Sequence, residues 1–207
     1  MKRPANWPKD CKFVDSQLVV FDPYTCKYIK FDTKISTHNN LELFKLPPDH
    51  PAFCDGHGYG VRATAMIKAD TTLGVYTGLW RYKTICEFNT FLFEVDKGDV
   101  DAQSYGNIFR FINDPMNTGK SANVYAEDSQ RIIPKKKYPH IFTYKLTTSR
   151  DIQAGEELFM NYGDAYWEML RLARDDARNQ VPVRKKIKHV ISEREFQSQF
   201  QDLFKEF

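Results

Sequence analysis

The sequence has few cysteines and no long apolar run among its 207 residues. The four cysteines, Cys11, Cys26, Cys54 and Cys86, lie far apart, without the paired spacing of metal ligands or the density of a disulfide framework. We therefore expect reduced thiols, no bound metal and an intracellular protein of the nucleus or the cytoplasm. No window approaches the ~20 apolar residues that span a bilayer, and the N-terminus lacks a signal-peptide pattern. The sequence thus predicts no membrane partner.

A strong charge of one sign is also absent. The 30 Lys and Arg residues against 27 Asp and Glu residues leave a net charge of +3, which is too small to attract nucleic acid over the whole molecule. Two local basic clusters, residues 135–137 and 184–189, could bind DNA, direct nuclear import or form solvated surface. Neither has the interleaved aromatic residues that stack on bases. Nucleic acid is therefore not expected as a direct substrate, and a nucleic-acid-binding protein is kept as an alternative.

The composition that is present suits one folded domain, with 42% apolar and 14% aromatic residues. Short β-leaning runs with glycine and proline between them dominate the first 150 residues. The expected strands are 18–21 and 27–31, which form a hairpin, and then 41–46, 74–77, 90–95 and 140–146. After Asp164 the apolar spacing becomes helical, which predicts helices over 164–179 and 196–207. The predicted fold class is mainly β, of the α+β type.

The first of three motifs is Gly58-Tyr59-Gly60-Val61. Because Gly58 and Gly60 have no side chains, the backbone can turn tightly and bring its N–H and C=O groups close to a ligand. The alternative is an ordinary glycine-rich loop, since such short patterns are weak signals on their own.

The second motif is Arg110-Phe111-Ile112-Asn113-Asp114, which follows Tyr105-Gly106-Asn107. Its polar end could form a binding turn. The alternative is a turn closed by an Asx hydrogen bond, which is common for Asn-Asp-Pro sequences.

The third motif runs from Gly155-Glu156-Glu157-Leu158 to Asn161-Tyr162-Gly163. A tyrosine among β-leaning residues usually packs in the core or at its rim, with its hydroxyl satisfied. That alternative remains open for Tyr162 considered alone.

In this order and spacing, the three motifs resemble those of SET-domain protein lysine methyltransferases. The resemblance covers about residues 41–167 and implies a SET-domain β fold with a pseudo-knot, an N-terminal β extension over 1–40 and a helical segment over 168–207. It implies methyl transfer from S-adenosylmethionine to a protein lysine, which leaves S-adenosylhomocysteine, with a histone tail as the first substrate to test. Tyr162 is the catalytic residue by this resemblance. The implied cofactor-binding residues are Gly58, Tyr59, Gly60, Arg110, Phe111, Asn113, Asp114 and Tyr162, and the implied substrate-channel residues are Tyr76, Tyr105, Tyr166 and Trp167.

Two departures from the family pattern are visible. Asp114 stands where the family usually has histidine, and the stretch 115–121 is longer than the usual link to Asn123. The Asp114 change favours the alternative of a catalytically silent SET-like protein-interaction module. No cysteine follows Cys86, so we expect the C-terminal helices, rather than a zinc segment, to close the lysine channel or to form a homodimer surface. Packing on the domain's own core is the other use of such apolar helix faces.

Overall fold

The computed structural model describes residues 3–22, 27–31, 35, 37–55, 58–81, 91–95, 98–132 and 140–178. The chain divides into two units, residues 1–164 and 165–207, and each is described by itself. Strands are the main secondary structure of the first unit, which holds all three motifs. Within the described residues, no helix is both long enough and apolar enough to cross a membrane.

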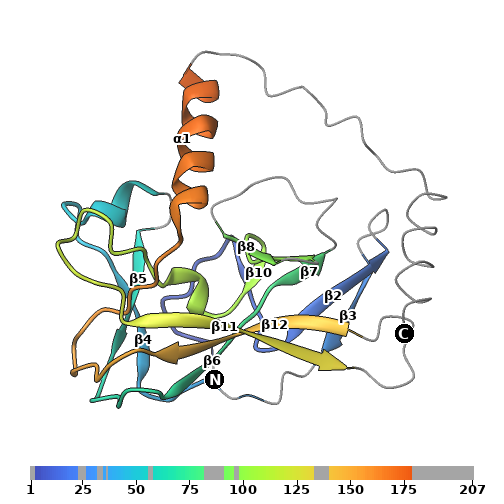
Figure 1. Cartoon of the computed structure of the whole chain (residues 1–207), viewed down its shortest axis with the longest axis horizontal. Coiled ribbons are helices and arrows are strands. Elements are labelled where there is room, and N and C mark those ends of the chain that lie inside the picture. Colours follow the sequence, from blue (N-terminus) through green and yellow to red (C-terminus); the bar gives the residue numbers. More distant parts are fainter. Residues whose placement is uncertain are drawn as a thin grey trace. The chain divides into compact units, whose positions relative to one another are not determined.

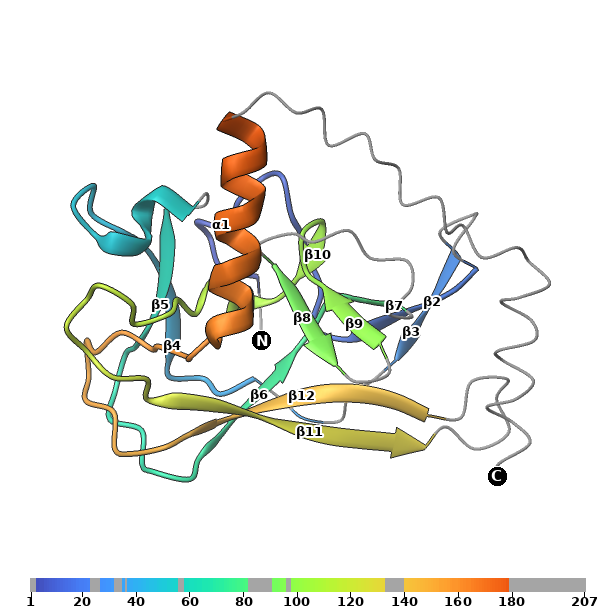
Figure 2. The same ribbon diagram turned by 45° about the horizontal axis from the view of Figure 1, so that its top comes forward.

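A five-stranded sheet contains the N-terminal hairpin (Figure 2). Its strands, in spatial order, are β3 (Lys27–Phe31), β2 (Gln17–Asp22), β7 (Leu79–Arg81), β9 (Gly98–Asp101) and β8 (Leu92–Val95). The predicted hairpin is confirmed, because β2 and β3 pair antiparallel. Strand β2 also pairs parallel with β7. The N-terminal segment therefore shares a sheet with strands from the middle of the chain.

A three-stranded sheet is built around the longest strand pair in the described chain (Figure 1). Strand β11 (Val124–Ile132) pairs antiparallel with β12 (His140–Thr148) over nine residue pairs, and β12 pairs on its other edge with β6 (Thr72–Tyr76). Strands β6 and β12 lie where the sequence predicts strands, whereas β11 was not predicted. Ladder hydrogen bonds at alternate pairs and side-chain contacts across the strands contribute along the whole length, so the stability of this sheet is spread over many small contributions.

Two smaller pairs and two short helical turns complete the first unit. Strand β4 (Leu41–Lys45) pairs antiparallel with β5 (Tyr59–Ala63), and β1 (Lys12–Phe13) pairs parallel with β10 (Tyr105–Gly106). The turns are η1 (Pro51–Asp55) and η2 (Ile108–Phe111). In β4, Leu41 and Leu43 are buried while Glu42 between them is partly exposed, which is the period-two pattern that predicts a strand with one face in the core.

The core lies where the three motifs meet. Side chains with an exposed fraction of 1% or less include Val61 of the first motif, Phe111 and Ile112 of the second, and Leu158 and Phe159 of the third. Burying each such side chain contributes about 1.5–3 kcal/mol. The convergence of the motifs is therefore part of what folds this unit.

Helix α1 (Asp164–Arg178) begins at the predicted residue. Leu170 is buried, whereas Met169 and Leu172 are exposed. Arg171 contacts Glu168 one turn earlier, and such an exposed pair contributes little to stability. The second predicted helix, over 196–207, lies outside the described residues.

Candidate functional site

The third motif passes between two segments of the second half of the fold. Asn113 forms a parallel bridge with Phe159, and Val124 forms one with Met160. The Met160 N–H donates to the Asn113 carbonyl at 2.9 Å, and the Val124 N–H donates to the Phe159 carbonyl at 3.0 Å. Residues 157–160 are thus held on one side by the second motif and on the other by the start of β11. This threaded arrangement, called the crossing below, is the pseudo-knot that the resemblance implies.

The first motif joins the crossing through the edge of β5 that β4 leaves open. The Leu158 N–H donates to the Val61 carbonyl at 2.8 Å, and the Ala63 N–H donates to the Glu156 carbonyl at 2.9 Å. Three segments that are distant in the sequence therefore meet within one hydrogen-bonded unit.

Asn123 locks the crossing from inside. Its side chain is fully buried; its Oδ1 accepts the Phe159 N–H at 2.8 Å and its Nδ2 donates to the Glu157 carbonyl at 2.9 Å. One amide side chain thus takes the place of a neighbouring strand and satisfies two backbone groups. Buried backbone N–H and C=O groups need such hydrogen-bond partners. The sequence pattern named Asn123 only as the end of a link.

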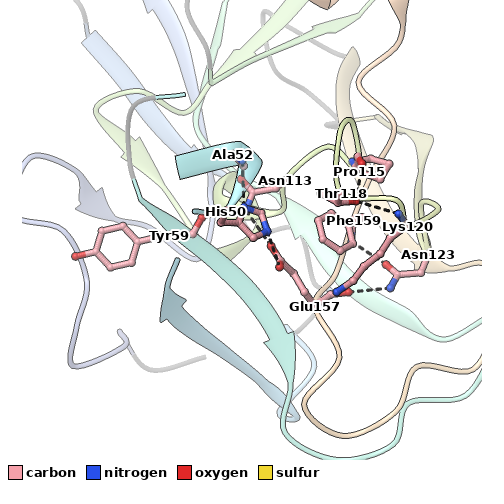
Figure 3. Close-up of polar contacts among 10 residues, drawn as sticks. All are labelled: His50, Ala52, Tyr59, Asn113, Pro115, Thr118, Lys120, Asn123, Glu157 and Phe159. Carbon is pink, nitrogen blue, oxygen red and sulfur yellow. Dashed lines mark hydrogen bonds and ion pairs between the residues drawn. The ribbon is translucent and has the colours of Figure 1, made fainter. Parts of the chain in front are cut away.

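Asn113 joins the first motif to the third (Figure 3). Its Nδ2 donates to the Tyr59 carbonyl and to Glu157 Oε1, both at 3.1 Å. Because both amide hydrogens are used in this way, the Asn113 carbonyl oxygen is the side-chain atom that remains to meet a ligand. The Tyr59 ring points away from this contact in Figure 3.

Glu157 is a buried carboxylate at the centre of these contacts, and the sequence analysis gave it no role. Its Oε2 lies 3.2 Å from Nε2 of His50, another residue that was not predicted. A Cβ on Gly60 would lie 2.7 Å from Glu157 Oε1 and equally close to the Phe44 ring. The missing side chain of Gly60 therefore makes room for the Glu157 carboxylate, whereas the sequence analysis assigned that room to a ligand.

Gly58 has the backbone conformation that its residue type favours. Its φ is +62°, in the left-handed region, and a Cβ there would make only an ordinary contact with Phe53 at 3.5 Å. The Gly58 carbonyl accepts the Leu46 N–H. The turn at Gly58 thus depends on backbone freedom rather than on close packing.

Tyr162 is fixed at two points. Its hydroxyl donates to the Ile112 carbonyl at 2.5 Å, and its N–H donates to Asp114 Oδ2 at 2.7 Å. Asp114 Oδ1 accepts the Met116 N–H at 2.8 Å. The carboxylate that replaces the usual histidine thus uses both oxygens to close its own turn, as an Asx turn does, and to hold the backbone of Tyr162.

The long stretch after Asp114 is an ordered turn. Thr118 donates its N–H and its hydroxyl to the Pro115 carbonyl, and its Oγ1 accepts the Lys120 N–H. The Lys120 ammonium lies 5.4 Å from the centre of the Phe159 ring. The insertion therefore covers part of the crossing.

Arg110 and Phe111 face the core. The Arg110 guanidinium lies 3.7 Å from the centre of the Phe91 ring and 4.7 Å from that of Phe111, and it donates to the Gln103 carbonyl. Burial lowers the pKa of Arg110. Phe111 packs edge-on against Trp7. These contacts give both residues packing roles, and their contact with a cofactor stays a prediction.

The predicted channel residues belong to three different elements, β6, β10 and α1. Tyr76 is buried in β6 and its hydroxyl donates to the Phe91 carbonyl at 2.9 Å. Tyr105 lies half-buried in β10, with the Lys12 ammonium 5.7 Å from its ring centre. Tyr166 and Trp167 belong to the second unit, where their rings meet edge-on at 5.3 Å. Their channel roles remain predictions.

Comparison with known proteins identifies the family to which the chain that forms this site is similar. The family model described as "SET domain" matches residues 58–163. "Histone-lysine N-methyltransferase EZH2" of Chaetomium thermophilum is 44% identical over 68 residues, which cover 32% of this chain and 4% of that protein. "Histone-lysine N-methyltransferase EHMT1" of Mus musculus is 29% identical over 120 residues, which cover 54% of this chain and 9% of that protein.

A solved structure, "crystal structure of KRYPTONITE in complex with mCHH DNA, H3(1-15) peptide and SAH", aligns with a TM-score of 0.48 and 25% identity. The alignment covers 62% of this chain and 24% of that chain. This chain spans less than a tenth of the length of the curated relatives named above. The family match covers all three motifs and the crossing between them, and the chain belongs to the SET domain family.

Proposed function

We propose that this protein transfers a methyl group from S-adenosylmethionine to the side-chain amine of a lysine in another protein. The observation that carries the proposal is the fixation of Tyr162, whose hydroxyl and backbone N–H are both held where the three motifs meet. Its relatives named as histone-lysine N-methyltransferases support a histone tail as the first substrate to test.

The chemistry of the predicted residues fits a positively charged methyl donor. Asn113 presents a carbonyl oxygen, because both of its amide hydrogens are used within the protein. Arg110 is the one cationic side chain among the predicted cofactor residues, and it is held in the core between two rings. A site of oxygen acceptors and aromatic rings attracts a cation, whereas an exposed guanidinium would repel it. We assign the direct cofactor contacts to Gly58, Tyr59, Asn113 and Tyr162.

The protein's main task is to present a neutral amine in the correct line. When bound, S-adenosylmethionine supplies a methyl group that is already activated on its sulfonium. A free lysine with a pKa of ~10.4 is neutral in only about one molecule in 2,500 at pH 7, which costs roughly 4.6 kcal/mol. An aromatic channel that excludes water disfavours the charged ammonium and so lowers this pKa.

Tyr162 can orient the reacting groups as an acceptor. Because its hydroxyl hydrogen is donated to Ile112, the phenol oxygen can offer lone pairs to the N–H of the amine and to the C–H groups of the methyl. Each weak C–H contact contributes about 0.5–1 kcal/mol, which is enough for alignment and too little for the whole acceleration.

The test is transfer of a radiolabelled methyl group to a histone mixture and to the protein itself. We expect Tyr162→Phe to lower kcat about 100-fold, because it removes the oxygen that accepts from the amine and the methyl group together with the bond to Ile112 that fixes the ring, and misplacement of the reacting groups can cost that much. Tyr125→Phe is the matched control, because Tyr125 is exposed on β11; its rate should stay within about twofold of the wild type.

Three outcomes would decide against parts of this proposal. Equal transfer by the wild type and Tyr162→Phe rejects the catalytic role of Tyr162. Absence of both transfer and cofactor binding by calorimetry rejects the activity. Cofactor binding without transfer to any lysine substrate supports the alternative of a silent protein-interaction module.

A further inference from the structure

We propose that His50 is a positioning residue for the cofactor site and acts through Glu157 on Asn113. The inference rests on the proposed function, because Asn113 matters here as a cofactor contact. His50 lies before residues 58–163, the part of the chain that the family model matches.

The two ring nitrogens of His50 have different partners. Nδ1 lies 3.1 Å from the Ala52 backbone nitrogen, whose N–H it accepts, and Nε2 lies 3.2 Å from Glu157 Oε2. An acceptor at Nδ1 leaves the hydrogen of the neutral imidazole on Nε2, where it donates to the carboxylate. The backbone of η1 thus fixes both the orientation and the tautomer of the ring.

Glu157 depends on this donor because it is buried without a cation. Among the residues that the structure describes, no lysine or arginine forms an ion pair with Glu157, and its side chain is 8% exposed. Its carboxylate oxygens are met instead by the His50 imidazole and the Asn113 amide (Figure 3). A buried carboxylate oxygen that loses its donor is left unsatisfied at a cost, which favours movement of the side chain toward another partner.

Movement of Glu157 would act directly on Asn113. One hydrogen of the Asn113 amide is held by Glu157 Oε1 and the other by the Tyr59 carbonyl. These two contacts decide which way the amide faces and so where its carbonyl oxygen lies. The ring of His50 is also parallel to that of Phe159, within 3° and with 6.4 Å between centres, which restricts movement of the ring across the crossing.

Two substitutions separate the functions of the two ring nitrogens. His50→Asn keeps an oxygen near the place of Nδ1 for the Ala52 N–H and loses the donor to Glu157. His50→Gln keeps an amide donor near the place of Nε2 and loses the acceptor for Ala52. His38→Asn is the matched control, because His38 Nδ1 likewise accepts the N–H of the residue two positions later, Asn40, at 3.2 Å.

The measurements are calorimetric binding of S-adenosylhomocysteine, steady-state methyl transfer, and NMR hydrogen exchange of the Asn113 side-chain amide in the protein without cofactor. We expect His50→Asn to weaken S-adenosylhomocysteine binding about tenfold and to raise the cofactor KM by a similar factor. The kcat at saturating cofactor should change by less than about twofold. Exchange at the Asn113 amide should become faster, His50→Gln should restore most of the binding, and His38→Asn should match the wild type.

A purely structural role would give a different result. It would lower the melting temperature and the active fraction, and hence kcat, with the cofactor KM unchanged. The inference would be overturned if His50→Asn bound S-adenosylhomocysteine and exchanged the Asn113 amide as the wild type does. It would also be overturned if His50→Asn and His50→Gln lost binding equally. If His50→Asn does not fold, Glu157→Gln carries the same exchange test, since its amide cannot accept from both His50 and Asn113.

Failure of the proposed function is distinguishable from failure of this inference. If the wild type binds no S-adenosylhomocysteine and transfers no methyl group, the proposed function fails. The exchange of the Asn113 amide then still shows whether His50 holds it, and an unchanged rate in His50→Asn overturns the link by itself.

Discussion

The crossing and the β11–β12 hairpin are stabilised in different ways. The hairpin is held by backbone pairing from Val124↔Thr148 to Ile132↔His140, so each residue adds a small and similar share. The crossing is held by isolated bridges and single backbone hydrogen bonds. Its other contacts come from buried side chains, and those of Asn113, Asp114 and Asn123 bind backbone groups. A single side chain in the crossing therefore carries contacts that the hairpin distributes over many residues.

The largest effect is expected for Asn123→Ala in the crossing. This change removes the side-chain partner of the Phe159 N–H and of the Glu157 carbonyl at a fully buried position. Leaving buried polar groups without partners costs about 1–3 kcal/mol, and we expect a free energy of unfolding lower by about 3 kcal/mol in urea titrations.

Thr147→Val is the matched change in the hairpin. Thr147 is also buried, and its hydroxyl donates to Glu127 Oε2 at 3.3 Å, but the strand pairing does not depend on that bond. The expected loss is below about 1 kcal/mol. Equal losses for the two substitutions would contradict the contrast between the two regions.

Asp114→Asn should have an intermediate effect on stability and a larger one on activity. An amide can accept only one of the two N–H groups that Asp114 receives, from Met116 and Tyr162. We expect a loss of about 1–2 kcal/mol in the free energy of unfolding and a lower kcat, because the backbone of Tyr162 is released. Asp128→Asn, at an exposed position of β11, is the control and should change neither quantity.

The smallest effect should appear as a pH dependence at the rim of the crossing. The hydrogen bond from Arg150 is the first cause that lowers the pKa of Glu156, followed by the N–H of Gln153 and the amide of Asn123. A lowered pKa in the folded state means that the stabilisation is present above the ordinary glutamate pKa and is lost as the pH falls through the lowered value. Glu156→Gln cannot titrate, so the wild type should lose its advantage over this variant on acidification.

The size of that advantage should be under about 1 kcal/mol at neutral pH, because the pair is partly exposed. Denaturant titrations of both proteins from neutral to acidic pH measure it. An advantage that grows on acidification would contradict the assigned ion pair.

Six of the twelve strands that the structure describes were predicted from the sequence, namely β2, β3, β4, β6, β8 and β12, whereas β11 was not. The runs at 27–31, 41–46 and 140–146 alternate or concentrate apolar residues, which is a local signal. Strand β11 contains Glu127, Asp128, Ser129 and Gln130 in succession, and these residue types disfavour a strand. Its pairing with β12 overrides that local preference.

The sequence predicted the motifs of the site but not the residues that hold those motifs in place. The motifs are short and their residue types are distinctive, so Asn113 and Tyr162 could be identified in the sequence. The contact between His50 and Glu157 depends on how η1 and the crossing pack together. Neither residue lies in a local sequence pattern that predicts this contact. Gly60 was assigned to ligand approach for a sound reason, but Glu157 takes up the room beside it.

The crossing also constrains the order in which the chain can fold as it is synthesised. Residues 157–160 need partners near Val61, Asn113 and Val124, and all of these are synthesised earlier. Closing such long loops is entropically costly and slow, so contacts distant in sequence tend to form late. A nascent chain that has not yet been extended past Tyr162 contains the strand and hairpin sequences but lacks the proposed catalytic tyrosine, so the proposed methyl transfer requires the last segment to be threaded.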